Sequence, residues 1–354
     1  GGARPRRVFP GAGGPTPRPV CPNRLYAAMS DDEARSGSAF SGVVLQDAED
    51  MVHPAALVAI DRALADADFV QLPVRPETLP GARWIAGHYA DEFAESHAKG
   101  MVVRDRLGAA LPAAGVGCGF SRSALRALAS VREAQGANGP FAAECLTEDY
   151  ELGLLIAQAG GKGRFLRLRD HAGLLISTRS FFPHRLDAAV RQKTRWVHGI
   201  ALQGWERMGW SGRPIEIWMA LRDRRGPLTA LVLGVAYLLV AIEALLAIAA
   251  LFGMARPLAV SPLLAAMLVA STLAFVWRCV FRFAFTAREY GPAEGLRAVL
   301  RIPLANVIAI MAGRRAIMAY MRSLKGKVVA WDKTEHSLHP AEFAGRAALQ
   351  AVPA

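Results

Sequence analysis

The chain has 354 residues, enough for one large domain and an appendage, and 53% of its residues are hydrophobic. Its formal net charge of +12 suits phosphate-bearing ligands and an anionic membrane surface. Nucleic acid is disfavoured as a partner, because long apolar runs lie among the basic clusters. Four cysteines without paired or metal-type spacing indicate reduced thiols of a cytoplasmic domain: Cys21, Cys118, Cys145 and Cys279.

The first acidic cluster follows a predicted strand. Residues 1–40 are rich in Gly, Pro, Arg and Ser and are expected to be irregular, whereas residues 42–46 (GVVLQ) have the composition of a buried strand. The strand leads into the tetrapeptide DAED, at the end of the strand where open α/β sheets bind ligands. Carboxylate oxygens suit a hard divalent cation, so we predict a site for Mg²⁺ or Mn²⁺ at Asp47, Glu49 and Asp50. A solvated turn is the alternative.

Apolar patterns then alternate between helical and strand periods. Residues 54–67, 84–99 and 121–131 are predicted helices, and residues 69–74 and 164–169 are predicted strands. The glycine-rich stretch at 115–120 is a predicted turn. It is not a dinucleotide-binding fingerprint, because no acidic residue follows a second strand at the required distance.

A further helix is predicted to begin at the sequence Thr-Glu-Asp. Thr147 can cap it, and Glu148 and Asp149 lie in its first turn, where the helix dipole favours an ionised carboxylate. Gly160 and Gly161 end it. Its apolar face consists of Leu152, Leu155, Ile156 and Ala159.

A longer helix is predicted at about residues 186–208. Gln192, Arg195 and Trp196 lie on one stripe of this helix, with Gly199 beside them. An amide, a guanidinium and an indole on one surface suit a diphosphate and a sugar ring. An indole that packs in the core is the alternative for Trp196.

Two long apolar runs follow, at residues 227–253 and 257–277, and each exceeds the roughly 20 residues needed to cross a bilayer. Arginines flank the pair on its outer sides, which predicts a hairpin with both ends in the cytoplasm. Residues 302–321 contain Arg314 and Arg315 and are predicted to lie in the membrane interface. The predicted regions are a domain at 41–212, a membrane region at 213–325 and a tail at 326–354.

The order of these motifs carries more information than any one of them. An Asp-x-Asp-like cluster, Thr-Glu-Asp and Gln-x-x-Arg-Trp, followed by membrane helices, resemble the processive membrane-bound glycosyltransferases of family 2, such as cellulose, chitin and hyaluronan synthases. The segments DAED, RQKTRW and WDKTEH are similar to the bacteriophage adsorption protein B branch. The resemblance covers roughly residues 14–340. It implies an α/β fold: a GT-A-like, Rossmann-type nucleotide-sugar domain followed by transmembrane and interfacial helices.

One segment departs from the family pattern. Residues 14–29 resemble a family segment that helps to hold the nucleotide; Asn23 matches its Asn, but Val20 replaces its acidic residue. The family's first nucleotide-binding strand and its early Asp would precede this segment, and neither is recognised in the sequence. The GT-A-like domain is therefore expected to be N-terminally incomplete.

The resemblance also implies roles for individual residues. Asp149, with Glu148 beside it, would take the proton from the acceptor hydroxyl. Gln192 and Arg195 would hold the diphosphate of the donor, and Trp196 would stack on the acceptor sugar.

Two aromatic or glycine-rich segments gain roles in the same way. Gly117, Gly119 and Phe120 would line the acceptor site, where glycines let a sugar approach the backbone. Phe181 and Phe182 would be the counterpart of an aromatic gating loop, with core packing as the alternative.

The expected function is that of an inverting transferase that moves a sugar from a nucleotide diphosphate sugar, with UDP as the nucleotide, to a glycan acceptor. The expected location is the bacterial inner membrane, with several spans and the catalytic domain in the cytoplasm. Besides donor, acceptor and bilayer, the partners would include an export partner in the outer membrane or periplasm. A degenerate transferase fold that serves as a membrane scaffold in phage adsorption is the competing reading, and a transporter is a weaker third.

Overall fold

The computed structural model describes residues 20–78, 81–142, 145–210, 213–254 and 260–326. The globular part is built on two small sheets. One contains four strands in the order β1 (Gly42–Leu45), β5 (Cys118–Ser121), β3 (Phe69–Gln71) and β6 (Gly163–Phe165). The other contains β2 (Met51–Val52), β7 (Thr178–Phe181) and β4 (Val74–Glu77). Parallel pairs β3–β6 and β4–β7 are combined with antiparallel pairs, so both sheets are mixed.

The strand predicted at residues 69–74 is in fact two strands, β3 and β4, which belong to different sheets. Pro73 lies between them and has no backbone N–H for a ladder. The neighbouring groups bond elsewhere: the Leu72 amide donates to the Gly117 carbonyl at 2.8 Å, and the Pro73 carbonyl accepts from the Thr178 amide at 3.0 Å. The chain thus passes from one sheet to the other at this proline.

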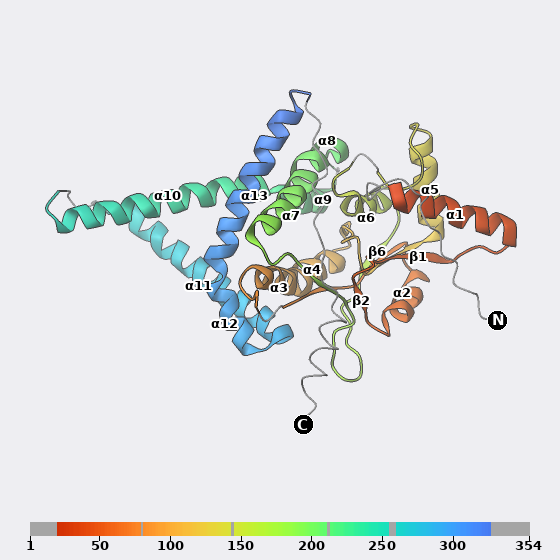
Figure 1. The fold of residues 1–354 in the computed structure, drawn as a ribbon, viewed down its shortest axis with the longest axis horizontal. Coiled ribbons are helices and arrows are strands. Elements are labelled where there is room, and N and C mark those ends of the chain that lie inside the picture. Colours follow the sequence, from red (N-terminus) through yellow and green to blue (C-terminus); the bar gives the residue numbers. More distant parts are fainter. Residues whose placement is uncertain (1–19, 79–80, 143–144, 211–212, 255–259, 327–354) are drawn as a thin grey trace.

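Helices cover both faces of the four-stranded sheet. Because side chains alternate along a strand, Phe69 packs on one face, with α5 (Arg122–Glu133) and α6 (Glu148–Gln158), and Val70 packs on the other. The helix α2 (Ala56–Leu64) covers the second face, so the sheet lies between helical layers (Figure 1). The described cysteines, Cys118, Cys145 and Cys279, are free thiols.

Residues 20–36 form helix α1 (Val20–Ser36), so the expectation of irregular structure is wrong for this segment. Tertiary contacts hold the helix, which a local pattern cannot reveal. The Asn23 amide pairs with the backbone of Phe141 in both directions, at 2.8 and 3.0 Å. Glu33 accepts hydrogen bonds from Arg122 on α5 at 2.7 to 3.0 Å.

Two long helices each contain a π-helical turn. The first comprises α3 (Ile85–Glu95), η1 (Ser96–Gly100) and α4 (Met101–Arg106). The second comprises α7 (Leu186–Trp196), η2 (Val197–Gln203) and α8 (Gly204–Met208), which together match the predicted helix at 186–208. Wider turns of this kind occur frequently at functional sites.

The C-terminal part is helical: α9 (Pro214–Arg224), α10 (Gly226–Leu251), α11 (Pro262–Tyr290), α12 (Pro292–Leu300) and α13 (Ile302–Ser323). By length and composition, α10, α11 and α13 could each cross a membrane. The most apolar stretches of α10 and α11 bury no residue in the protein, and both helices extend away from the globular part (Figure 1). In contrast, α13 packs against α7 and η2 as well as against α10.

A buried ion-pair cluster joins this helical part to the globular part. The Arg301 guanidinium, at the start of α13, contacts Asp91 on α3 at 2.6 Å and Glu294 on α12 at 3.0 Å. It also donates to the Arg83 carbonyl at 2.8 Å. A side chain at Gly87 would collide with this guanidinium, so the glycine admits it.

Candidate functional site

The three sequence motifs line one cavity of about 90 Å³. The acidic turn after β1 contributes Asp47, Glu49 and Asp50. The start of α6 contributes Thr147, Glu148 and Asp149, and α7 contributes Gln192, Arg195 and Trp196. Three segments that are well separated in sequence therefore meet in one cavity, as the motif order predicts.

Thr147 precedes α6 but does not cap it. Its hydroxyl makes no capping hydrogen bond, and Oγ1 is buried without a partner among the described residues, so the predicted cap is wrong. The reason lies in the neighbouring helix: a Cβ at Gly199 would come within 2.5 Å of Thr147 Oγ1. Gly199 thus lets the helix that carries Gln192 pack directly on the Thr-Glu-Asp corner.

The side chain of Asp149 is half-buried, and its Oδ1 accepts a hydrogen bond from the Tyr150 amide at 2.8 Å. Its other oxygen lies against Gly115, where an added side chain would collide with it. Gly115 also has a φ of 77°, which favours glycine. Glu148, beside Asp149, is only 6% exposed.

A buried carboxylate fixes α6 relative to α7, η2 and α8. Glu151, 1% exposed, accepts hydrogen bonds from Cys145 Sγ and from Arg207 Nε, both at 3.1 Å. Burial, with Glu151 beside it, raises the pKa of the Cys145 thiol, which therefore stays protonated. Leu146 adds a second link, because its amide donates to Gln203 Oε1 at 3.1 Å.

A hydrogen bond within the acidic turn closes it. The Asp47 amide donates to Asp50 Oδ2 at 3.2 Å, and burial raises the pKa of Asp50 to about 6. No three His, Cys, Asp or Glu side chains in the described part of the chain are grouped to hold a metal ion. Mg²⁺ in nucleotide sites is usually held by one or two carboxylates together with phosphates, so the metal site at Asp47, Glu49 and Asp50 stays a prediction.

The Gln-x-x-Arg-Trp stripe forms the opposite wall. Gln192 is 5% exposed, and its Oε1 has no hydrogen-bond partner among the described residues. The Trp196 ring packs edge-on against Tyr89 and Phe182, with centroids 6.0 and 6.4 Å apart. Trp196 and Phe182 therefore both line the cavity and belong to an aromatic cluster, which includes Phe93.

The predicted acceptor-site residues of the glycine-rich segment do not line this cavity. Phe120 is fully buried and stacks on Phe69, with ring centroids 5.0 Å apart. Gly119 faces Ile60 of α2, and Gly117 donates its amide to Gln46 at 3.2 Å. The reason is that the predicted turn at 115–120 becomes strand β5 from residue 118, whose side chains enter the core.

Comparison with known proteins agrees with the motif geometry. The sequence model of the protein family "Glycosyl transferase family group 2" matches residues 42–287 of the chain. The chain belongs to this family. It is 33% identical over 344 residues to the bacteriophage adsorption protein B of Escherichia coli (strain K12), and equally to the bacteriophage N4 adsorption protein B of Escherichia coli O157:H7. Each match covers 91% of this chain but only 46% of the relative, so the chain spans less than half the length of these relatives.

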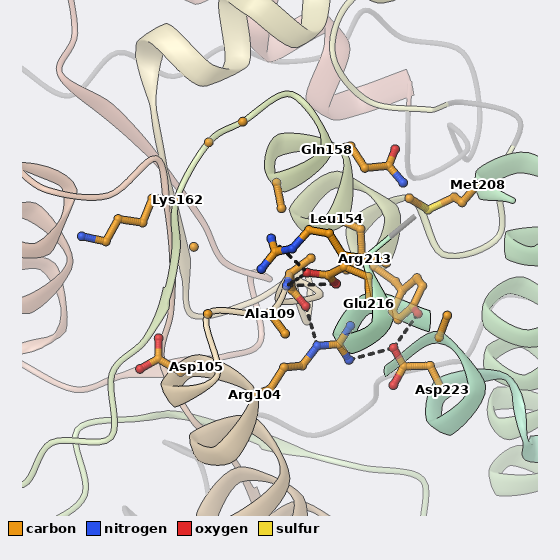
Figure 2. Close-up of a pocket in the computed structure, with 18 of the residues that line it drawn as sticks. Arg104, Asp105, Ala109, Leu154, Gln158, Lys162, Met208, Arg213, Glu216 and Asp223 are labelled. Atoms are coloured by element: carbon orange, nitrogen blue, oxygen red, sulfur yellow. Dashed lines mark hydrogen bonds and ion pairs between the residues drawn. The ribbon is translucent and has the colours of Figure 1, made fainter. Parts of the chain in front are cut away.

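A larger hollow of this family member, about 890 Å³, lies elsewhere and contains none of the motif residues (Figure 2). Several of its polar groups bond to one another: Asp223 on α9 accepts from Arg104 and from the Tyr150 hydroxyl, both at 2.7 Å. Glu216, also on α9, accepts from the Ala110 amide at 3.1 Å. These contacts attach α9 to the globular part, and we therefore regard the smaller cavity as the candidate site of the transferase.

Sequence reasoning missed two residues that shape this site, Gly115 and Glu151. Gly115 belongs to the recognised glycine-rich run, but only its positive φ and its contact with Asp149 reveal its role. Glu151 lies one helical turn after Thr147, and the sequence alone does not separate it from an exposed acidic residue of a helix. The available signal for the burial of Glu151 was its place between Tyr150 and Leu152, which are both buried.

Proposed function

We propose that the protein is an inverting glycosyltransferase that transfers a sugar from a nucleotide diphosphate sugar, with UDP as the nucleotide, to a glycan hydroxyl at the bacterial inner membrane. The observation that carries this proposal is that Asp149 and Arg195 line the same cavity from two separate helices. A carboxylate base and a phosphate-binding guanidinium in one enclosed space are what attack at an anomeric carbon and departure of a diphosphate require.

Asp149 would accept the proton of the attacking hydroxyl, for which it must be ionised and within hydrogen-bond reach. Arg195 would hold the leaving diphosphate by paired N–H donors. The Gln192 carbonyl oxygen, buried without a partner in the described part of the chain, would accept a hydrogen bond from a sugar hydroxyl. Trp196 would present its ring to a sugar face.

The donor needs more room than 90 Å³, since ligand pockets commonly measure about 300–1,000 Å³. A second hollow of about 340 Å³ adjoins the cavity and shares Asp47, Glu148 and Asp149 with it. Its other walls are apolar and include Tyr26 of α1 and Val43 of β1. This hollow suits the nucleoside, with the diphosphate directed toward Arg195.

Asp47 and Glu49 would hold Mg²⁺ or Mn²⁺, which when bound neutralises charge on a departing diphosphate. If they do, a chelator should weaken UDP binding and either ion should restore it. UDP binding that is independent of metal would favour a structural role for the acidic turn.

The competing function is a membrane scaffold in phage adsorption. The names of the two Escherichia coli relatives favour it, because both refer to bacteriophage adsorption. An export partner in the periplasm or outer membrane would suit either function.

Incorporation of radiolabelled UDP-sugars in membranes that contain the protein separates the two functions. Asp149→Asn should lower incorporation by at least about a hundredfold, the usual contribution of a general base, while expression stays unchanged. Asp61→Asn, at an exposed position of α2, is the matched control and should leave incorporation unchanged. Unaltered incorporation in Asp149→Asn would exclude this residue as the base, and no incorporation by the wild type from any UDP-sugar would favour the scaffold.

A further inference from the structure

A separate groove of about 410 Å³ lies between α13 and the helix formed by α7 and η2. Among the described residues, its lining contains no acidic side chain and five arginines: Arg191, Arg195, Arg314, Arg315 and Arg322. Arg191 pairs with Asp187 at 3.0 Å, and the groove contains three further guanidinium groups besides Arg195, more than the transfer reaction uses. Such a concentration of cationic donors suits phosphate, which arginine binds through paired N–H groups.

The same groove contains a buried polar atom that has no hydrogen-bond partner among the described residues. His198 of η2 lines the groove and is 2% exposed, and its Nδ1 has no hydrogen-bond partner among the described residues. Leaving such an atom unsatisfied is unfavourable, so a ligand that bonds to it gains affinity. Burial lowers the pKa of His198, so its imidazole is neutral near pH 7 and offers a hydrogen bond rather than a charge.

The groove is close to the start of the most apolar helix. α13 runs antiparallel to α10: Asn306 donates to the Tyr237 hydroxyl at 3.2 Å, and Gly313 packs so closely on Ala230 that a side chain there would collide. Arg314 and Arg315 are therefore level with the first turns of α10, which begins at Gly226. If α10 crosses the membrane, as proposed, this level is that of the lipid headgroups.

We propose that this groove binds the phosphate group of an anionic membrane lipid. The volume is sufficient for a headgroup, the lining is cationic, and the position is where such phosphates lie. A soluble phosphate has the same chemistry, but only a lipid is held at this level by its own acyl chains.

The proposed lipid site adjoins the transfer site, because Leu146 and Arg195 line both the groove and the cavity. A lipid phosphate and a donor diphosphate thus lie on either side of one guanidinium. This link rests on the proposed transfer function, whereas the binding of lipid does not.

The test measures, by native mass spectrometry, the binding of short-chain phosphatidylglycerol to the purified protein in neutral detergent. Phosphatidylcholine and inorganic phosphate are the comparison ligands. Phosphatidylglycerol should bind more tightly than either, and Arg314→Gln with Arg315→Gln should weaken it at least about tenfold, the loss of one charge-assisted hydrogen bond. Both side chains are exposed, so the change should not disturb folding.

Arg222→Gln with Arg225→Gln is the matched control. It removes the same charge from exposed positions just before α10, outside the groove, and should leave phosphatidylglycerol affinity within about twofold. Equal affinity for phosphatidylglycerol and phosphatidylcholine, or an equal loss in both double variants, would overturn the proposal. Tighter binding of inorganic phosphate than of phosphatidylglycerol would overturn the assignment to a lipid. Sugar incorporation, measured in parallel, shows whether a failure concerns the lipid site or the transferase.

Discussion

Replacing Arg301 should weaken the attachment of the helical part to the globular part, and should lower the free energy of unfolding more than the replacement of any exposed charged residue. The Arg301 side chain is 1% exposed and that of Asp91 is 2% exposed, with 2.6 Å between the guanidinium and the carboxylate. Arg301→Ala removes one partner of a buried pair and leaves Asp91 in an apolar environment. Breaking such a pair typically costs about 3–5 kcal/mol in the free energy of unfolding.

The structure supplies a control in the same cluster. Arg297 pairs with the same Glu294, but its side chain is 37% exposed. Arg297→Ala should therefore cost less than about 1 kcal/mol. Burial raises the pKa of Asp91, whereas Arg301 opposes that shift, so loss of Arg301 should also favour protonation of Asp91 and lessen the cost at low pH.

Unfolding of both variants in mild detergent, followed by denaturant titration, measures the difference. Arg301→Met combined with Asp91→Leu should regain most of the lost stability, because an apolar pair of similar volume removes the uncompensated charge. If Arg301→Ala were no more destabilising than Arg297→Ala, the cluster would not be the attachment we infer.

Three further predictions concern the site, the first helix and the membrane. Gly115→Ala should abolish transfer by displacing Asp149, whereas Gly136→Ala, with a similar φ of 79° but open space around it, should not. Hydrogen bonds from Arg122 lower the pKa of Glu33 to about 2. The contribution of this ion pair to stability is therefore complete above the ordinary pKa of 4.5 and is lost as the pH falls toward 2. Pepsin cleavage of α1 should increase over that range, and Glu33→Gln should remove the dependence. Single cysteines after α10 should react with an impermeant reagent from outside, and those after α13 should not; reaction outside after α13 would mean a third crossing.

The parts that followed from the sequence are those set by local pattern. The helices predicted at 54–67 and 186–208 appear where apolar periodicity placed them, within a few residues, whereas the helix predicted at 84–99 continues to Arg106. The three motifs meet in one cavity. This could be predicted from their order and spacing, but not from any single helix.

The parts that did not follow depend on contacts distant in sequence. Helix α1 forms because Asn23 and Glu33 find partners on other elements, although its own sequence has no clear apolar stripe. Thr147 has the right residue type for a cap, but the approach of Gly199 decides its conformation. Phe120 has the right position in the motif, but strand pairing turns it into the core.

One helix links the candidate site, the cationic groove and the start of α10. Arg195 faces both hollows, His198 lines the groove, and a Cβ at Gly226 would touch Val197 at 3.5 Å. Gly199, one residue after His198, packs on Thr147. The π-helical turn η2 therefore contacts α10, α13 and the Thr-Glu-Asp corner at the same time.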